Sequence, residues 1–192
     1  EPRPDHLAGR EELIGQLQKY RSTKDYVSLL LVDVEGRVQW DSDNEAAAPE
    51  PMLMQVVRSA VASNEVANPP PYRDTSSRLR LDFVAPMATH NGIPAAAVVL
   101  RTDPGSYLFP LLRSWPVPSS SAETLLFRRD GDQVIYLNDL LYRTDAAARF
   151  QASIATPRLL AAQVLRGEVK PGRLFEGEDY RGVPVLGVVR AV

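Results

Sequence analysis

The sequence lacks cysteine and has only two histidines, His6 and His90, among its 192 residues. Without cysteine there can be no disulfide, no thiol nucleophile and no thiolate metal site. Two histidines so far apart in the chain also leave little from which to build a histidine relay or a multi-histidine metal centre. We therefore expect a non-catalytic protein with no cofactor, no metal site and no catalytic residue.

Long apolar runs and an excess of positive charge are missing as well. The longest stretch without a charged residue, 83–100, contains Pro86, Asn91, Gly92 and Pro94, so it predicts two strands and a turn rather than a membrane-spanning helix. The net charge of -2 gives no reason to expect nucleic acid as a partner. With 44% hydrophobic and 24% charged residues, the composition is typical of a globular domain.

The spacing of apolar residues along the chain predicts hairpins that alternate with helices. Apolar spacing indicates helices over residues 10–22, 52–63 and 106–114, with further helical structure within 145–166. Alternating or continuous apolar stretches predict strands over residues 26–34, 37–40, 78–87, 94–100, 124–129, 133–137, 173–176 and 183–192. Tight turns are expected at 35–36, 90–92, 130–131 and 181–182.

This order repeats once along the chain. Each half has a hairpin, then helical structure, then a second hairpin, and the second hairpins share a Gly-x-Pro start at Gly92 and Gly182. An antiparallel sheet flanked by helices is an α+β unit. We therefore expect two α+β units, over residues 1–104 and 105–192, with a helix at the N-terminus.

Several segments resemble one family of sensor domains. They are Arg101–Pro104, Tyr107–Pro116, Ser121–Leu126, Asp130–Gly131, Leu137–Asn138 and Asp179–Val185. Together they are similar to tandem PAS-like domains of the double Cache (PDC) type. The resemblance implies two PAS-like modules, the first of them membrane-distal, in the extracytoplasmic (periplasmic) part of a bacterial transmembrane receptor, most often a sensor histidine kinase. It also implies a homodimer, with membrane contact only through segments outside this sequence.

The resemblance places a ligand pocket in the first module. The second module ends at Val192, before a closing strand that the resemblance leads us to expect, so we expect the sequence to be a piece of a longer protein. The expected partner is a small polar or carboxylate-bearing ligand.

The candidate ligand-binding residues fall in three places in the first module. Tyr72, Arg73 and Asp74 follow three prolines, where a loop covering the pocket is expected, and a solvated turn is the alternative. Arg80 and Asp82 alternate with Leu79 and Phe83, so they line the cavity or form a polar outer face. Arg101 and Asp103 end a strand, although an aspartate before Pro104 is often only a turn former. Arginine at such positions could hold a carboxylate, and a tyrosine hydroxyl and an aspartate could hold an ammonium or hydroxyl group.

Two other interpretations are weighed against this one. The segment Asp41–Glu45 begins like a calcium loop, but Ala46 and Met52 stand where such a loop needs glycine and glutamate, so no metal is expected. A ligand-free dimerisation or spacer module is the alternative function. It predicts a filled apolar interior in the first unit, without converging arginine, aspartate and tyrosine side chains.

Overall fold

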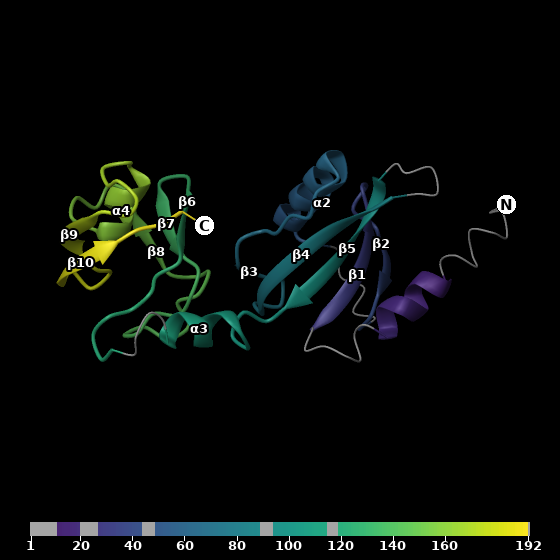
Figure 1. Cartoon of the computed structure of the whole chain (residues 1–192), viewed down its shortest axis with the longest axis horizontal. Coiled ribbons are helices and arrows are strands. Elements are labelled where there is room, and N and C mark those ends of the chain that lie inside the picture. Colours follow the sequence, from purple (N-terminus) through teal and green to yellow (C-terminus); the bar gives the residue numbers. More distant parts are fainter. Residues whose placement is uncertain (1–10, 20–26, 44–48, 89–93, 115–118, 192) are drawn as a thin grey trace. The chain divides into compact units, whose positions relative to one another are not determined.

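The computed structural model describes residues 11–19, 27–43, 49–88, 94–114 and 119–191. The chain is an α+β structure of two compact units, Glu1–Tyr107 and Leu108–Val192 (Figure 1). Residues 11–19 are helical, within the range predicted for the N-terminal helix. The predicted turn at 90–92 lies outside the described residues. Of the helices that the structure describes, none has the length and apolar character needed to cross a bilayer.

The first unit is built on a five-stranded antiparallel sheet with the order β2-β1-β5-β4-β3. Its strands are β1 (Ser28–Asp33), β2 (Val38–Asp41), β3 (Tyr72–Arg73), β4 (Leu79–Ala88) and β5 (Pro94–Thr102). β5 lies in the centre and pairs with both β1 and β4. The last strand of the unit therefore joins its two hairpins into one sheet.

Helix α2 (Pro51–Ser63) covers one face of this sheet. Proline at the first helical position fits there because its missing N–H would have no helical partner, and Asn64 ends the helix in the left-handed conformation. Leu53, Val57 and Ala60 are fully buried on the helix. They pack with apolar side chains of β1, β4 and β5, which are Leu30, Val32, Val84, Ala97 and Val99. The helix predicted over residues 52–63 is confirmed.

Three hairpins of the chain share one aspartate-capped turn, which begins at Asp33, Asp74 and Asp179. In each, the carbonyl of the aspartate accepts a hydrogen bond from the residue three positions later. One carboxylate oxygen of the aspartate accepts backbone N–H groups from positions two and four residues later. The residue at the third position has positive φ, and it is glycine in two turns but Ser77 (φ 62) in the third.

Ser77 therefore bears a backbone strain that glycine would relieve. The left-handed conformation costs a non-glycine residue about 1–2 kcal/mol. Replacing that residue by glycine recovers only part of this free energy, because glycine loses more conformational entropy when the chain folds. We expect Ser77→Gly to raise the free energy of unfolding of the first unit by about 0.5–1 kcal/mol, measured by denaturant titration. The reverse change in a matched turn, Gly182→Ser, should cost a similar amount, since a Cβ at Gly182 meets no atom within 4 Å. If neither variant changes the free energy of unfolding, the positive φ at this turn position does not strain the backbone, and the prediction is wrong.

The second unit divides its strands between two sheets. A three-stranded sheet has the order β6-β7-β8 and a two-stranded sheet the order β10-β9. Their strands are β6 (Phe127–Asp130), β7 (Gln133–Tyr136), β8 (Gln151–Ser153), β9 (Leu174–Glu178) and β10 (Pro184–Val188). The two predicted hairpins are present as β6-β7 and β9-β10, but they do not join into a single sheet as the hairpins of the first unit do.

The helices of the second unit are short. They are α3 (Leu108–Ser114) and α4 (Leu160–Leu165), and α4 contacts strands β6, β7 and β9. Its buried Ala161 and Ala162 pack with Val134 and Tyr136. The helical structure expected within 145–166 is therefore confined to its last part. Residues 151–153 form β8 instead, because their backbone pairs with β7.

Candidate functional site

One face of the first sheet changes from apolar to polar near the start of α2. Leu30, Val99 and Val84 lie opposite one another on β1, β5 and β4 and form an apolar row across the sheet. Two residues further along each strand, the corresponding row is Ser28, Arg101 and Asp82. Because side chains two apart on a strand share a face, both rows lie on the face that α2 covers. All three residues of the polar row are buried. Sequence and register together thus place a buried arginine and a buried aspartate on neighbouring strands.

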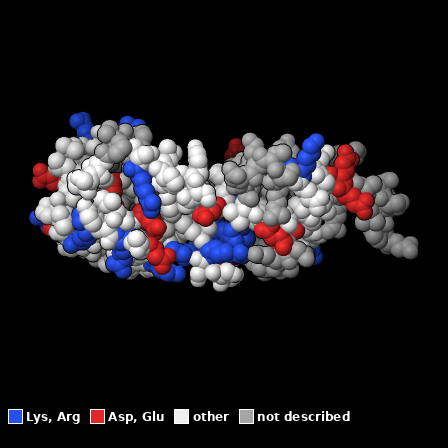
Figure 2. All heavy atoms as spheres, turned by 90° about the horizontal axis from the view of Figure 1, so that it is seen from below, with Lys and Arg blue, Asp and Glu red and all other residues white. Residues whose placement is uncertain are grey.

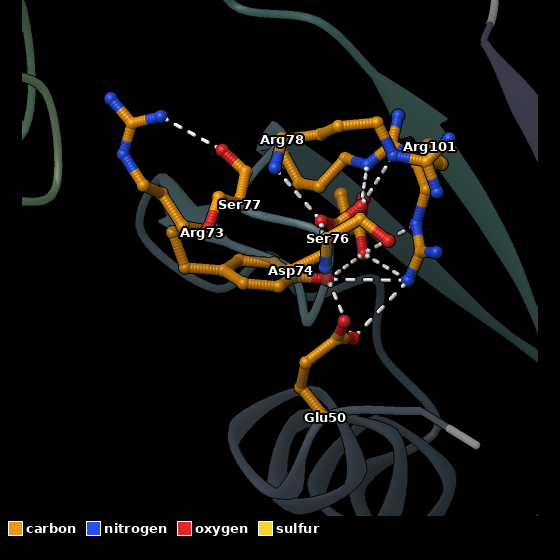
Figure 3. Close-up of polar contacts among 10 residues, drawn as sticks. Glu50, Arg73, Asp74, Ser76, Ser77, Arg78 and Arg101 are labelled. Carbon is orange, nitrogen blue, oxygen red and sulfur yellow. Dashed lines mark hydrogen bonds and ion pairs between the residues drawn. The ribbon is translucent and has the colours of Figure 1, made fainter. Parts of the chain in front are cut away.

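Arg101 is held by three oxygen-bearing side chains. Its Nε and Nη2 each lie 3.4 Å from Oδ2 of Asp82, and Nη2 also donates to the Tyr72 hydroxyl at 3.3 Å and to Oε2 of Glu50 at 3.4 Å. The Tyr72 hydroxyl donates to the same Oδ2 of Asp82 at 2.5 Å. Glu50 comes from the residue before α2, so the cluster joins the helix start to three strands of the sheet (Figure 3).

The environment of this cluster sets the charge of its members. Burial raises the pKa of Asp82 above its ordinary value, although Arg101 and Tyr72 act in the opposite direction. Burial, and then the neighbouring Asp82, raise the pKa of Tyr72 far above its usual range, so the hydroxyl stays protonated and remains a donor. Burial acts to lower the pKa of Arg101, but Asp82, Tyr72 and Glu50 raise it, so the guanidinium stays charged.

A second cluster forms where the β3–β4 turn meets β4. Oδ2 of Asp74 lies 2.9 Å from Nε of Arg80 and 3.0 Å from Nε of Arg78. The side chains of Asp74 and Arg80 are 3% and 4% exposed, whereas that of Arg78 is 46% exposed. Burial acts to raise the pKa of Asp74, but hydrogen bonds from the Arg78 backbone and from Arg80 lower it below its ordinary value. Asp74 is therefore an ionised carboxylate that organises both the turn and a buried arginine.

A hollow of about 370 Å³ lies between these clusters. Five ionisable side chains line it, together with Ser28 and Ser76, and they are Asp41, Glu50, Asp74, Arg78 and Arg101. The five ionisable side chains and the two serines come from β1, β2, the start of α2, the β3–β4 turn and β5. On the face of the molecule drawn in Figure 2, acidic and basic side chains likewise lie next to one another, and no single sign of charge covers it. The hollow thus offers both carboxylate acceptors and guanidinium donors.

The structure brings together five of the seven residues named from the sequence. Asp74 and Arg101 line the hollow, and Tyr72, Arg80 and Asp82 are buried in the clusters beside it. The polar-outer-face alternative for Arg80 and Asp82 is wrong. The opposite face of β4, which carries Phe83 at 39% exposure, is the more open one, because α2 covers the face of Arg80 and Asp82.

Arg73 and Asp103 do not lie at the hollow. Arg73 pairs in register with Leu79, on the face of β3 opposite Tyr72, and its Nη1 donates to the carbonyl of Ser77 at 2.8 Å. Figure 3 shows its side chain reaching away from the clusters. Asp103 accepts a hydrogen bond from the backbone N–H of Gly105, so it is a turn former.

Eight lining residues were not among the candidates named from the sequence, and they are Ser28, Leu30, Asp41, Pro49, Glu50, Thr75, Ser76 and Arg78. Glu50 occupies the cap position directly before a proline-led helix, but that position alone does not predict its contact with Arg101. Asp41 was weighed only as a calcium ligand. Within the ranges that the structure describes, no group of three or more histidine or acidic side chains is placed to hold a metal ion.

Comparison with known proteins adds one distant likeness. The chain matches no protein-family model and no curated protein. Among solved structures it is similar to an extracellular ligand binding receptor from Desulfohalobium retbaense DSM5692, with 13% sequence identity and a TM-score of 0.48. The similarity covers 88% of this chain and 28% of the receptor chain. A likeness of this degree carries no argument about what the chain does.

Proposed function

We propose that this chain is the extracytoplasmic sensing region of a bacterial transmembrane receptor, and that this receptor is a histidine kinase. The chain itself, in this proposal, is not an enzyme. In this proposal the first unit binds a small polar molecule in the hollow beside α2. The observation that carries the proposal is the convergence of five ionisable side chains from two strands, one turn and one helix start on a single hollow. A volume of about 370 Å³ falls at the lower end of the range for small-molecule sites, about 300–1,000 Å³.

The charges around the hollow favour a ligand that carries both signs. Three carboxylates line it, but only two guanidiniums, and both are already engaged, Arg101 by Asp82, Tyr72 and Glu50 and Arg78 by Asp74. A lone carboxylate would therefore meet more negative than positive charge. A zwitterionic molecule could place its carboxylate near Arg78 and its ammonium group near Asp41 and Glu50.

Signalling would follow from the elements that the ligand joins. The lining residues connect the start of α2 to β1, β2, β5 and the β3–β4 turn. A ligand shifts a conformational equilibrium only through its different affinity for the two states, so it must favour the arrangement in which these elements close on it. The receptor would then respond to the positions of these elements and not to a chemical change in the ligand.

A thermal-shift screen tests this proposal with a matched pair of arginines. Amino acids, amines, carboxylates and sugars are added separately to the purified chain. A true ligand at about 100 times its Kd should stabilise the native state by about 2.7 kcal/mol. Arg78→Ala should abolish the shift, because Arg78 lines the hollow. Arg73→Ala should preserve it, because Arg73 belongs to the same turn but points away from the hollow.

Two outcomes would overturn the proposal. If no compound raises the melting temperature and the chain self-associates tightly, the ligand-free spacer function is favoured instead. If Arg73→Ala and Arg78→Ala reduce a shift equally, the compound binds elsewhere.

A further inference from the structure

Two carboxylates of the first unit share the same two donor groups. The Tyr72 hydroxyl lies 2.5 Å from Oδ2 of Asp82 and 3.4 Å from Oε2 of Glu50. Nη2 of Arg101 lies 3.4 Å from each of these two oxygens. Figure 3 shows the side chain of Glu50 pointing from the start of α2 toward that of Arg101. When both carboxyl groups are ionised, two negative charges therefore meet one guanidinium and one hydroxyl proton.

The donors are too few to satisfy both carboxylates. A tyrosine hydroxyl carries a single proton, so Tyr72 donates to one carboxylate at a time. Its contact with Asp82 is much the shorter, and Glu50 is left with contacts of 3.4 Å only from Tyr72 and Arg101. Oδ1 of Asp82 is buried and has no hydrogen-bond partner among the described residues. An ionised carboxylate in this position is costly, because a buried acceptor without a donor loses its hydration and gains nothing in return.

The other charged groups near these two carboxylates supply no second cation, within the part of the chain that the structure describes. Arg78 and Arg80 are both bonded to Oδ2 of Asp74. Arg58 is the only charged residue of α2, and it donates to a backbone carbonyl beyond the end of β1. Asp41 of β2 lines the hollow and is a further carboxylate. The shortage of positive charge around the pair is therefore not made up by neighbouring elements.

We propose that this cluster is a proton-binding site, in which Asp82 takes up one proton and Tyr72 passes the change on to Glu50. The protonated carboxyl of Asp82 donates from Oδ2 to the Tyr72 oxygen, which can accept a hydrogen bond while it donates another. The hydroxyl proton of Tyr72 then turns from Asp82 to Oε2 of Glu50. One proton enters from the solvent and no covalent bond between heavy atoms changes. Arg101 and Glu50 remain as a pair of opposite charges.

Burial favours this uptake, because it disfavours the charged form of a carboxyl group. Burial raises the pKa of Asp82 above its ordinary value, although Arg101 and Tyr72 act in the opposite direction. Acidification should therefore protonate Asp82 and strengthen the hydrogen bond from Tyr72 to Glu50. Because Glu50 directly precedes α2 and Tyr72 lies in β3, proton uptake ties the start of the helix more firmly to the sheet. The first unit thus responds to acidity without any small molecule.

Carbon-13 NMR of the side-chain carboxyl groups tests this inference in the purified 192-residue chain. The Asp82 carboxyl carbon should titrate with a midpoint above 3.8, and the Glu50 carboxyl carbon should shift at that same midpoint. In Tyr72→Phe the midpoint of Asp82 should move to still higher pH, because its ionised form loses a donor. The accompanying shift of Glu50 should disappear. Asp82→Asn should abolish the shared transition while keeping the size of the side chain.

The matched control is Tyr136→Phe, which removes a buried hydroxyl of the second unit that has no hydrogen-bond partner among the described residues. It should leave the shared transition unchanged. The inference is wrong if Asp82 titrates at or below 3.8, or if Glu50 does not shift at the midpoint of Asp82 in the unchanged chain. It is also wrong if Glu50 still shifts at that midpoint in Tyr72→Phe. No small molecule enters the experiment, so its outcome is independent of the thermal-shift screen.

Discussion

Replacing Arg101 by leucine is expected to lower the free energy of unfolding of the first unit by about 3–5 kcal/mol. Arg101 is the cation that faces Asp82, whose side chain is fully buried and whose Oδ1 has no hydrogen-bond partner among the described residues. Without Arg101 an ionised Asp82 would remain in the protein interior, which is far costlier than losing an exposed ion pair. Native-state amide exchange of β1 and β5 measures this loss for the first unit alone.

The pH dependence of the same variant gives the sign of the effect. Burial raises the pKa of Asp82 above its ordinary value of 3.8, and Arg101 opposes that rise. Removing Arg101 therefore raises the pKa further in the folded chain but not in the unfolded chain. A carboxyl with a higher pKa in the folded state costs stability as pH rises, so the deficit should be small near pH 3.8 and grow toward neutral pH.

The double variant Arg101→Leu with Asp82→Leu is the control for this prediction. It removes both charges together, so it should recover most of the stability that the single variant loses. A single-variant loss below about 1 kcal/mol would be the size expected of an exposed ion pair. That result would mean that the Arg101 cluster does not organise the interior of the first unit.

Part of this cluster could be predicted from the sequence, and the limits have a physical cause. The alternation of residues 78–83 predicts a strand with two different faces, and β4 is that strand. Alternation does not say which face is covered, and an apolar face is the usual guess for the inner one. Here the buried face carries Arg80 and Asp82, because Asp74 pairs with Arg80 while Tyr72 and Arg101 donate to Oδ2 of Asp82.

Neighbouring positions in the turn show the same limit. Arg73 and Arg78 are both arginines of one hairpin, but only Arg78 lines the hollow. The register of β3 with β4 decides this, since it pairs Tyr72 with Arg80 and Arg73 with Leu79 on opposite faces. Glu50 was beyond local inference because it meets Arg101 across 51 positions of the chain. Such a contact follows only from how α2 packs on the sheet.

The second unit was predicted least well, for a different reason. Its two hairpins are local structures that depend on turns such as Asp130–Gly131 and Asp179–Gly182. Whether two hairpins join into one sheet depends on pairing between distant strands. In the first unit β5 makes this connection by pairing with β1, whereas β10 pairs only with β9 among the described strands.

Asp74→Asn is the second change with a large expected effect, a loss of about 3–5 kcal/mol in the first unit at neutral pH. The asparagine can still cap the turn by accepting from backbone N–H groups, as Oδ1 of Asp74 does now. It cannot neutralise Arg80, whose side chain is 4% exposed and lies 2.9 Å from Oδ2. Amide exchange of β4 and the β3–β4 turn measures the loss.

The pKa of Asp74 fixes the pH range over which that loss is seen. Its pKa is lowered in the folded state, so its ionised form stabilises the fold above the unfolded value near 3.8. This stabilisation is lost as pH falls through the lower folded pKa. The difference between the unchanged chain and Asp74→Asn should therefore be constant at neutral pH and shrink below pH 3.8.

Asp33→Asn is the matched control, because Asp33 caps the same turn in the first hairpin of this unit. Its Oδ2 is bonded by Gln39 and by Arg37, whose side chain is 70% exposed, so no buried cation depends on it. The expected loss is about 1 kcal/mol or less. If the two variants lose equal stability, the aspartate acts only through its turn. A clear excess for Asp74→Asn instead means that one turn of a repeated type supplies the charge that keeps an arginine buried beside the hollow.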